Sequence, residues 1–285
     1  MRSIKLLALC AALFAPQAVR AQSDIINILL SGPAGYPSGQ AFAFDANILP
    51  SLSTNIAGST AVTADGDTVG TWRDDSGNAF HLAAAADDTT RPVYHVSGGK
   101  GYVSFTSASS QVLIRSASSG LWQNTNGNFT VCFSLRAPSI ATNAVVLAEG
   151  SSSAANPIIK FLTANATTAS SASVNYRTDG ATVIQNPVGV VQANALDSTW
   201  RVVCMINKGN GTQGNIDGTQ GTFLTWSSGY SSAITTNRFT MGAIINNGAA
   251  GSYADVDISA ARGWPRILSP TELNRVLSLM KAAHP

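Results

Sequence analysis

Carboxylates that could act in pairs are scarce in this chain. Hydrolysis of a glycosidic bond needs two carboxyl groups about 5–9.5 Å apart, one on each side of the bond. Glutamate occurs only at Glu149 and Glu272. Asp255 and Asp257 fall on one face of an expected strand, but their alternation with apolar neighbours is typical of a solvated outer face. We therefore expect no catalytic carboxylate pair and no enzyme activity.

Other catalytic signatures are missing as well. The sequence has no Gly-x-Ser-x-Gly elbow, no phosphate loop and no dinucleotide fingerprint. Its three histidines, His81, His95 and His284, are scattered along the chain. Histidine-based metal sites and triads need clustered side chains, so neither is expected.

Calcium is the metal that the sequence could best accommodate. Asp65-Gly-Asp67 and the group Asp74, Asp75 and Asn78 place hard oxygen ligands in expected loops. If an ion binds, we expect Asp74 or Asp75 to coordinate it. The alternative is turn formation, because Asp, Asn and Gly form the same turns without any ion.

Two polar loops carry the candidate ligand-binding residues. Trp226 and Tyr230 flank Ser227-Ser-Gly229, and Asn246 and Asn247 precede a glycine. An aromatic ring beside amide groups could bind a sugar. The alternative for this loop is simple packing, because amphipathic aromatic residues often cover the ends of β-sandwiches. Trp72 and Trp200 fall on expected strands, and we place both in the core.

The N-terminus has the pattern of an export signal. Arg2 and Lys5 precede the apolar stretch 4–14, Pro16 interrupts it, and cleavage is expected after Ala21. The alternative is a short apolar helix used in assembly. Residues 1–21 are thus interpreted as a signal peptide and the protein as secreted, with a virion as the alternative location.

Only 11% of the residues are charged, and export would leave the chain almost neutral. Removal of residues 1–21 lowers the number of Lys and Arg from 17 to 14, against 15 acidic residues. Nucleic acids and anionic membranes attract strongly basic surfaces, so neither is expected as a partner.

Cys132 and Cys204 remain after cleavage, 72 positions apart. An exported protein with two cysteines could bridge them. However, Cys204 follows the apolar register of Val202 and Ile206, whereas Cys132 alternates with polar residues. Residues on opposite faces of a sheet cannot bring their Cβ atoms within about 4 Å. The pattern predicts two unbridged thiols.

The rest of the chain predicts an all-β fold with one terminal helix. From residue 41 on, short apolar runs alternate with clusters of Gly, Asn, Ser and Asp. Residues 22–40 are interpreted as a flexible arm and 41–285 as one domain. Ser269, Pro270 and Glu272 form a capping box with proline at the first helical position. Leu273, Val276, Leu277 and Met280 would then form the buried stripe of the helix.

Several short segments of the chain, in the order in which they occur, resemble concanavalin A-like (laminin-G-like) domains of bacterial secreted and phage virion proteins. They include Phe44-Asp-Ala46, Val69-Gly-Thr-Trp72, Asp75-Ser-Gly-Asn78, Arg91-Pro-Val-Tyr94, the strand at Trp200 and Asp217-Gly218. The resemblance covers nearly all of residues 41–282. It implies a jelly-roll β-sandwich of two antiparallel sheets, often with a carbohydrate or protein ligand and sometimes calcium. The Glu-x-Asp-x-x-Glu motif of laminarinase-like members is absent here.

The leading functional interpretation is a non-catalytic binding module for a glycan or a cell-surface ligand. The alternative is a structural phage virion protein, such as a decoration or tail component. A glycan-cleaving enzyme comes third. A homo-oligomer or a virion assembly is compatible with the sequence.

Overall fold

The computed structural model describes residues 35–86, 89–122, 126–185, 193–227 and 233–285. The chain divides into residues 1–39 and a compact unit, Gln40–Pro285. The expected signal peptide, 1–21, and Tyr230 lie outside the described residues, as does most of the expected arm. Within the described residues, no helix is both long and apolar enough to cross a membrane.

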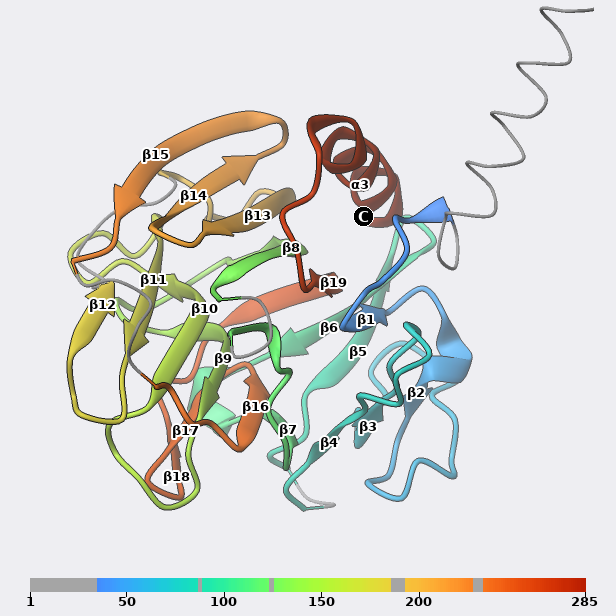
Figure 1. Ribbon diagram of the computed structural model, residues 1–285. Helices are drawn as coiled ribbons and strands as arrows, with labels where there is room; N and C mark the ends of the chain where they lie inside the picture. Colours follow the sequence, from blue (N-terminus) through green and yellow to red (C-terminus); the bar gives the residue numbers. More distant parts are fainter. Residues whose placement is uncertain (1–34, 87–88, 123–125, 186–192, 228–232) are drawn as a thin grey trace, which may run out of the picture. The chain divides into compact units, whose positions relative to one another are not determined.

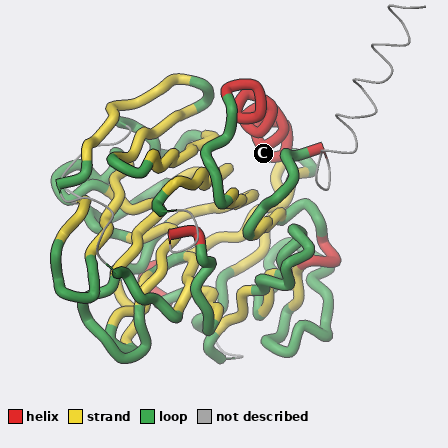
Figure 2. The backbone as a smooth tube through the Cα atoms, in the orientation of Figure 1, coloured by secondary structure: helices red, strands yellow, loops and turns green. Residues whose placement is uncertain are grey.

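The compact unit is a jelly-roll β-sandwich of two antiparallel sheets with one helix near its C-terminus, as the sequence predicts (Figures 1 and 2). The strands of the first sheet are, in order, β15 (Thr219–Thr225), β14 (Gly211–Ile216), β13 (Arg201–Lys208), β8 (Asn128–Arg136), β19 (Val256–Trp264), β6 (Lys100–Phe105) and β5 (Val93–Ser97). In addition, β1 (Phe42–Asp45) pairs with β19. We call this the eight-stranded sheet.

The second, nine-stranded sheet faces the first across the core. Its strands are, in order, β12 (Val183–Gln185), β11 (Ala172–Arg177), β10 (Ile158–Ala164), β9 (Val145–Gly150), β16 (Arg238–Met241), β7 (Leu113–Arg115), β4 (Leu82–Ala84), β3 (Thr71–Trp72) and β2 (Leu52–Ser53). A separate hairpin of β17 (Ile244–Asn246) and β18 (Ala249–Gly251) packs on β9 and β16. Two 3-10 turns, Leu49–Ser51 and Ser107–Ser109, complete the regular structure of the described residues.

The core between the sheets is aromatic. Phe42 and Phe80 each contact the ring of Phe239 with centroids 5.0 Å apart, and Phe129 meets Phe161 at 5.4 Å. Such edge-on contacts stabilise beyond the burial of area alone. The sandwich thus holds its two sheets in fixed positions, and the residues on their outer faces lie on a rigid support.

The helix α3 (Pro270–Ala283) forms as the capping box predicts. The Ser269 hydroxyl accepts a hydrogen bond from the Glu272 amide at 3.3 Å, and the Glu272 carboxylate accepts one from the Ser269 amide at 2.9 Å. The four apolar residues of the predicted stripe are all buried. The helix lies against β8, β13 and β19, which covers part of the outer face of the eight-stranded sheet (Figure 1).

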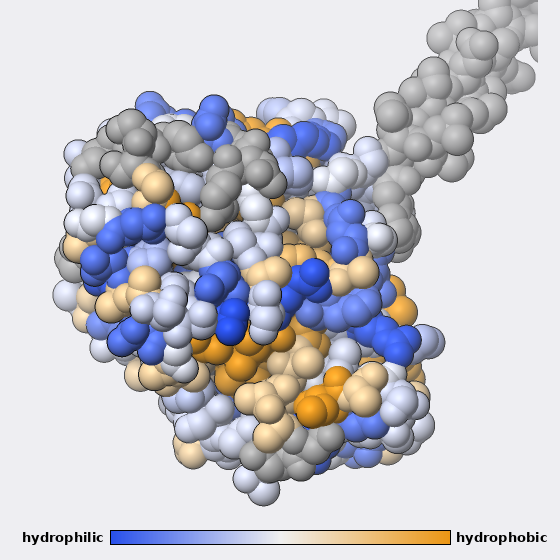
Figure 3. Space-filling view, turned by 60° about the horizontal axis from the view of Figure 1, so that its bottom comes forward, coloured by the Kyte–Doolittle hydropathy of each residue, from blue (hydrophilic) through white to orange (hydrophobic). Residues whose placement is uncertain are grey.

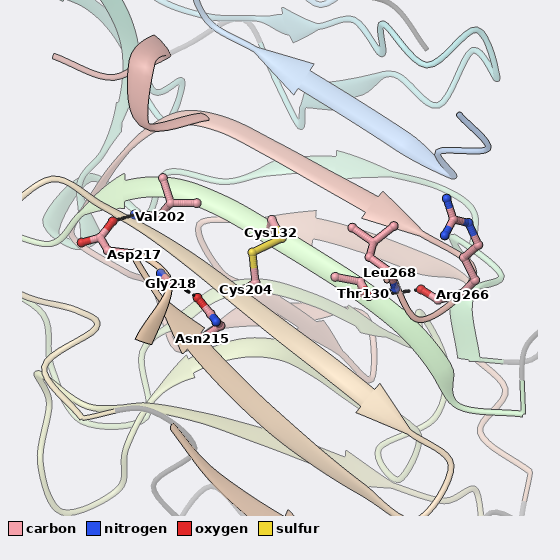
Figure 4. Close-up of a disulfide and its surroundings, with 9 residues drawn as sticks. All are labelled: Thr130, Cys132, Val202, Cys204, Asn215, Asp217, Gly218, Arg266 and Leu268. Atoms are coloured by element: carbon pink, nitrogen blue, oxygen red, sulfur yellow. Dashed lines mark hydrogen bonds between the residues drawn. A yellow bond between two sulfur atoms is a disulfide. The ribbon is translucent and has the colours of Figure 1, made fainter. Parts of the chain in front are cut away.

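The prediction of two unbridged thiols is wrong, because Cys132 and Cys204 form a disulfide with a sulfur–sulfur distance of 2.06 Å. They are direct cross-strand partners on β8 and β13 (Figure 4). Val203 and Met205 are the β13 residues that enter the core, so Cys204 lies on the outer face together with Cys132. The prediction assumed that one face of β13 is buried and the other exposed, whereas both faces are buried.

Candidate functional site

The carboxylate of Asp74 organises a turn. It accepts hydrogen bonds from the amides of Ala43, Ser76 and Phe80 at 2.7–3.0 Å, and from the Ser76 hydroxyl at 2.6 Å. These donors occupy the lone pairs that a metal ion would need. Among the described residues, no group of three or more His, Cys, Asp or Glu side chains could hold a metal ion. The turn interpretation therefore accounts for Asp74, and calcium at Asp75 stays a prediction.

Trp226 lies in the core, so its placement in an exposed ligand-contact loop is wrong. The side chain is 6% exposed, and its ring packs on Trp122 at 5.2 Å and on Tyr176 at 6.1 Å. Its indole nitrogen donates to the Thr212 hydroxyl at 3.2 Å. Polar neighbours in the sequence suggested exposure, but distant residues supply the apolar surroundings.

Asn246 and Asn247 belong to the turn between β17 and β18. Asn247 and Gly248 form its two-residue loop, and both have positive φ angles, 51° and 77°. An Asn-Gly pair is the usual choice for such a turn. The amides of Asn247 and Gly248 donate to the carbonyls of Ala154 and Ser151. This geometry matches the packing alternative for the loop.

A different group of aromatic residues is half-exposed on the outer face of the eight-stranded sheet. We call Tyr102, Arg136, Trp200 and His284 the aromatic cluster. The Arg136 guanidinium lies 5.4 Å from the Tyr102 ring centroid and 5.3 Å from that of Trp200. The ring of His284, at the C-terminal end of α3, stacks on Trp200 at 5.6 Å and 9°. Contrary to the core placement expected from the sequence, Trp200 thus reaches the surface.

Strand pairing explains why these side chains meet. Arg136 on β8 is opposite Asp257 on β19, and Asp257 is opposite Ser104 on β6. Side chains at opposed positions share a face, and Tyr102 lies two residues before Ser104 on the same face. Trp200 directly precedes β13, where Arg201 pairs with Leu135, so the same register continued by one residue places Trp200 opposite Arg136. The chain folds so that four separate segments supply one surface.

An ion pair fixes the arginine of the cluster. Its Nε donates to an Asp257 oxygen at 2.7 Å, and the Ser104 hydroxyl donates to the other oxygen. Burial raises the pKa of Tyr102, so its hydroxyl stays protonated at neutral pH. Next to it, His95 lies 5.4 Å from the Tyr102 ring and contacts Asp65 at 3.1 Å. The cluster therefore combines three flat rings with a fixed arginine.

Charged residues are a small part of the chain as a whole. In the view of Figure 3, most of the face is weakly polar, and apolar side chains are exposed near its centre between hydrophilic ones. This agrees with the 11% of charged residues in the sequence. Sequence reasoning missed the aromatic cluster because its members come from distant segments. The one available signal was the presence of Tyr102 and Arg136 at polar positions of alternating strands.

Comparison of the sequence with protein-family models and with curated proteins finds no match. Solved structures with a similar fold include the receptor-binding domain of botulinum neurotoxin type G, with a TM-score of 0.50 and 11% identity over 85% of this chain and 51% of that one. The CBM40 module of the Ruminococcus gnavus IT-sialidase, bound to α2,3 sialyllactose, has a TM-score of 0.43 and 16% identity, over 53% and 83% of the two chains.

The NanB sialidase of Streptococcus pneumoniae, as a K499G mutant, has a TM-score of 0.42 and 14% identity, over 52% of this chain and 23% of that one. This chain thus spans about a quarter of the sialidase and about half of the toxin chain. At such identities the likeness concerns the fold alone. The toxin domain, with its TM-score of 0.50, supports the β-sandwich.

Proposed function

We propose that this protein is a non-catalytic saccharide-binding module and that the aromatic cluster is its binding surface. The observation that carries the proposal is the arrangement of Tyr102 and Trp200 around Arg136. Half-exposed aromatic side chains combine apolar and polar surface, which suits contact with a sugar ring. A fixed arginine beside them adds several N–H donors for hydroxyl or carboxylate oxygens.

The state of the carboxylates supports binding without catalysis. Glu149 is fully buried and accepts hydrogen bonds from the Ser118 hydroxyl, the Ser119 amide and the Thr236 hydroxyl. Asp255 accepts from both the amide and the hydroxyl of Ser107. Such carboxylates hold loops and strands in place. A glycosidase would need two of them accessible on either side of a bound sugar.

The disulfide supports the proposal that the protein works outside the cell. Disulfides persist in oxidising compartments and are rare in the cytosol. The Cys132–Cys204 bridge is buried beneath α3, which fits a structural role in an exported chain. Export also fits the predicted signal peptide and the proposed glycan ligand.

A glycan array, followed by calorimetric titration with the best ligand, tests this function. We expect Trp200→Ala and Tyr102→Ala each to weaken binding at least about tenfold, which corresponds to about 1.4 kcal/mol. Phe223→Ala is the matched control, because Phe223 on β15 is also exposed, at 38%, but lies outside the cluster. Unchanged affinity in both cluster variants, with a folded protein, would reject the proposal.

A further inference from the structure

A cavity of about 560 Å³ opens where β2, β3 and β4 form one end of the nine-stranded sheet. This volume lies in the range of small-molecule sites. Apolar side chains, including Ile48, Pro50, Ile56 and Ala83, form much of its wall. Arg73, Asp74, Asp75 and His81 supply the polar part. None of these residues belongs to the aromatic cluster.

Most polar groups of this wall already have partners. Asp74 accepts four hydrogen bonds, three from its own turn and one from the Ala43 amide of β1. His81 accepts the Asp74 amide proton on Nδ1 at 3.0 Å, so that nitrogen carries no proton. The Arg73 guanidinium donates to the carbonyl of Gly58 on the opposite wall. Asp75 is the acidic group of the wall that these bonds do not satisfy.

Asp75 is the exception. Its Oδ2 atom is buried and has no hydrogen-bond partner among the described residues. A buried carboxylate without donors is unfavourable unless another group offsets its charge. The nearby carboxylates of Asp45 and Asp74 repel it, and Arg262 attracts it. Burial is the largest influence and raises the pKa of Asp75 to about 6.

We propose that this cavity binds an organic ammonium group, a primary amine on a compact apolar or sugar body, with Asp75 as its counterion. The ammonium supplies a positive charge and N–H donors to the part of the half-buried Asp75 side chain that lines the cavity. The apolar wall contacts the body of the ligand. The carboxylates around Asp75 favour a cation over a neutral hydroxyl donor. The inference does not depend on the proposed saccharide site.

The test uses two probes of the same shape, cyclohexylammonium and cyclohexanol, titrated into the full folded chain at pH 7.5. Methyl signals of Ile56 and Ala83 in NMR spectra report occupancy. We expect cyclohexylammonium to bind about tenfold or more tightly than cyclohexanol, in line with a charge-assisted hydrogen bond. Asp75→Asn should abolish this preference while keeping the shape of the cavity.

Two further variants separate the roles of space and charge. Ala83→Leu fills the cavity and should weaken both probes although Asp75 remains. Asp179→Asn removes one exposed carboxylate beyond the opposite end of the same sheet and should change nothing. Equal binding of the two probes, or an undiminished preference in Asp75→Asn, would reject the proposal. Calcium chloride alone producing the same saturable shifts would identify a metal site instead and would also overturn it.

Discussion

Cys132 of β8 and Cys204 of β13 face each other directly across two central strands, and their sulfurs are bonded beneath α3. Hydrogen bonds close to the disulfide connect β8 to the segment that leads into α3 (Figure 4). The Thr130 hydroxyl donates to the Arg266 carbonyl at 3.1 Å and accepts from the Leu268 amide at 3.2 Å. This ties the segment leading into α3 to β8. The disulfide joins β8 to β13, and these hydrogen bonds connect the same sheet to α3.

Removal of the disulfide should destabilise the protein. The two cysteines lie 72 positions apart, and in the chain-entropy model a loop of this size contributes about 4 kcal/mol. We expect the double variant Cys132→Ala, Cys204→Ala to lose about 2–4 kcal/mol in urea unfolding. Wild type unfolded in the presence of reductant should shift by a similar amount. Coincident unfolding curves in all three cases would show that the bridge does not stabilise this fold.

Local signals predicted the elements, and distant contacts decided their faces. The capping box at Ser269 was readable because all its atoms come from four consecutive residues. The orientation of Cys204 could not be predicted from the sequence. The helix α3 packs on β13, so residues on both faces of this strand are buried and most of them are apolar. Trp200 was expected in the core and Trp226 at the surface, and the structure shows the reverse for a related reason. Their surroundings come from segments far away in the sequence.

Trp226→Ala should strongly destabilise the fold. The side chain is buried against Trp122 and Tyr176, and truncation of a buried tryptophan costs about 3–5 kcal/mol. Trp226→Phe keeps most of the apolar contact and should lose less, although it also removes the donor to Thr212. Thermal and urea unfolding measure both losses. A Trp226→Ala variant as stable as wild type would place this residue at the surface after all.

Asp75 should make the protein less stable as the pH rises from about 4 to about 6. Its pKa is about 6 in the folded chain against 3.8 ordinarily, mainly because of burial, with Asp45 and Asp74 adding repulsion and Arg262 opposing it. In this window the folded state holds the proton that the unfolded state has lost, so stability falls as pH rises. A difference of one in pKa corresponds to about 1.4 kcal/mol for a buried group, but Asp75 is only half-buried, so solvent screening limits the loss to about 1–2 kcal/mol.

Asp75→Asn removes this titration and tests the assignment. The variant should unfold at higher urea concentration than wild type at pH 7, and the two should converge near pH 4. Urea unfolding at a series of pH values measures the stability of each protein. Two-dimensional NMR of the Asp75 carboxyl carbon measures the pKa of Asp75 in wild type. A variant less stable than wild type at pH 7 would mean that the Asp75 charge stabilises the fold.

Glu272 should show the opposite pH dependence. The Arg266 guanidinium, at 2.6 Å and 2.8 Å from its two oxygens, is the main cause that lowers the Glu272 pKa to about 2. A lowered pKa in the folded state stabilises above the unfolded value, near 4.5, and this contribution is lost as pH falls toward 2. Both side chains are about a third or more exposed, so solvent limits the ion pair to about 1 kcal/mol or less.

The conservative variant Glu272→Gln isolates the ion pair, because glutamine can still complete the capping box with Ser269. We expect it to lose about 0.5–1 kcal/mol at pH 7 and much less near pH 2, where about half of the wild-type carboxyl is protonated as well. Added salt should shrink the difference at pH 7, because the pair is partly exposed. Ser269→Ala is the matched comparison: it removes the cap and should cost about 1 kcal/mol at every pH. A Glu272→Gln loss that persists at pH 2 would assign the stabilisation to the cap rather than to the charge.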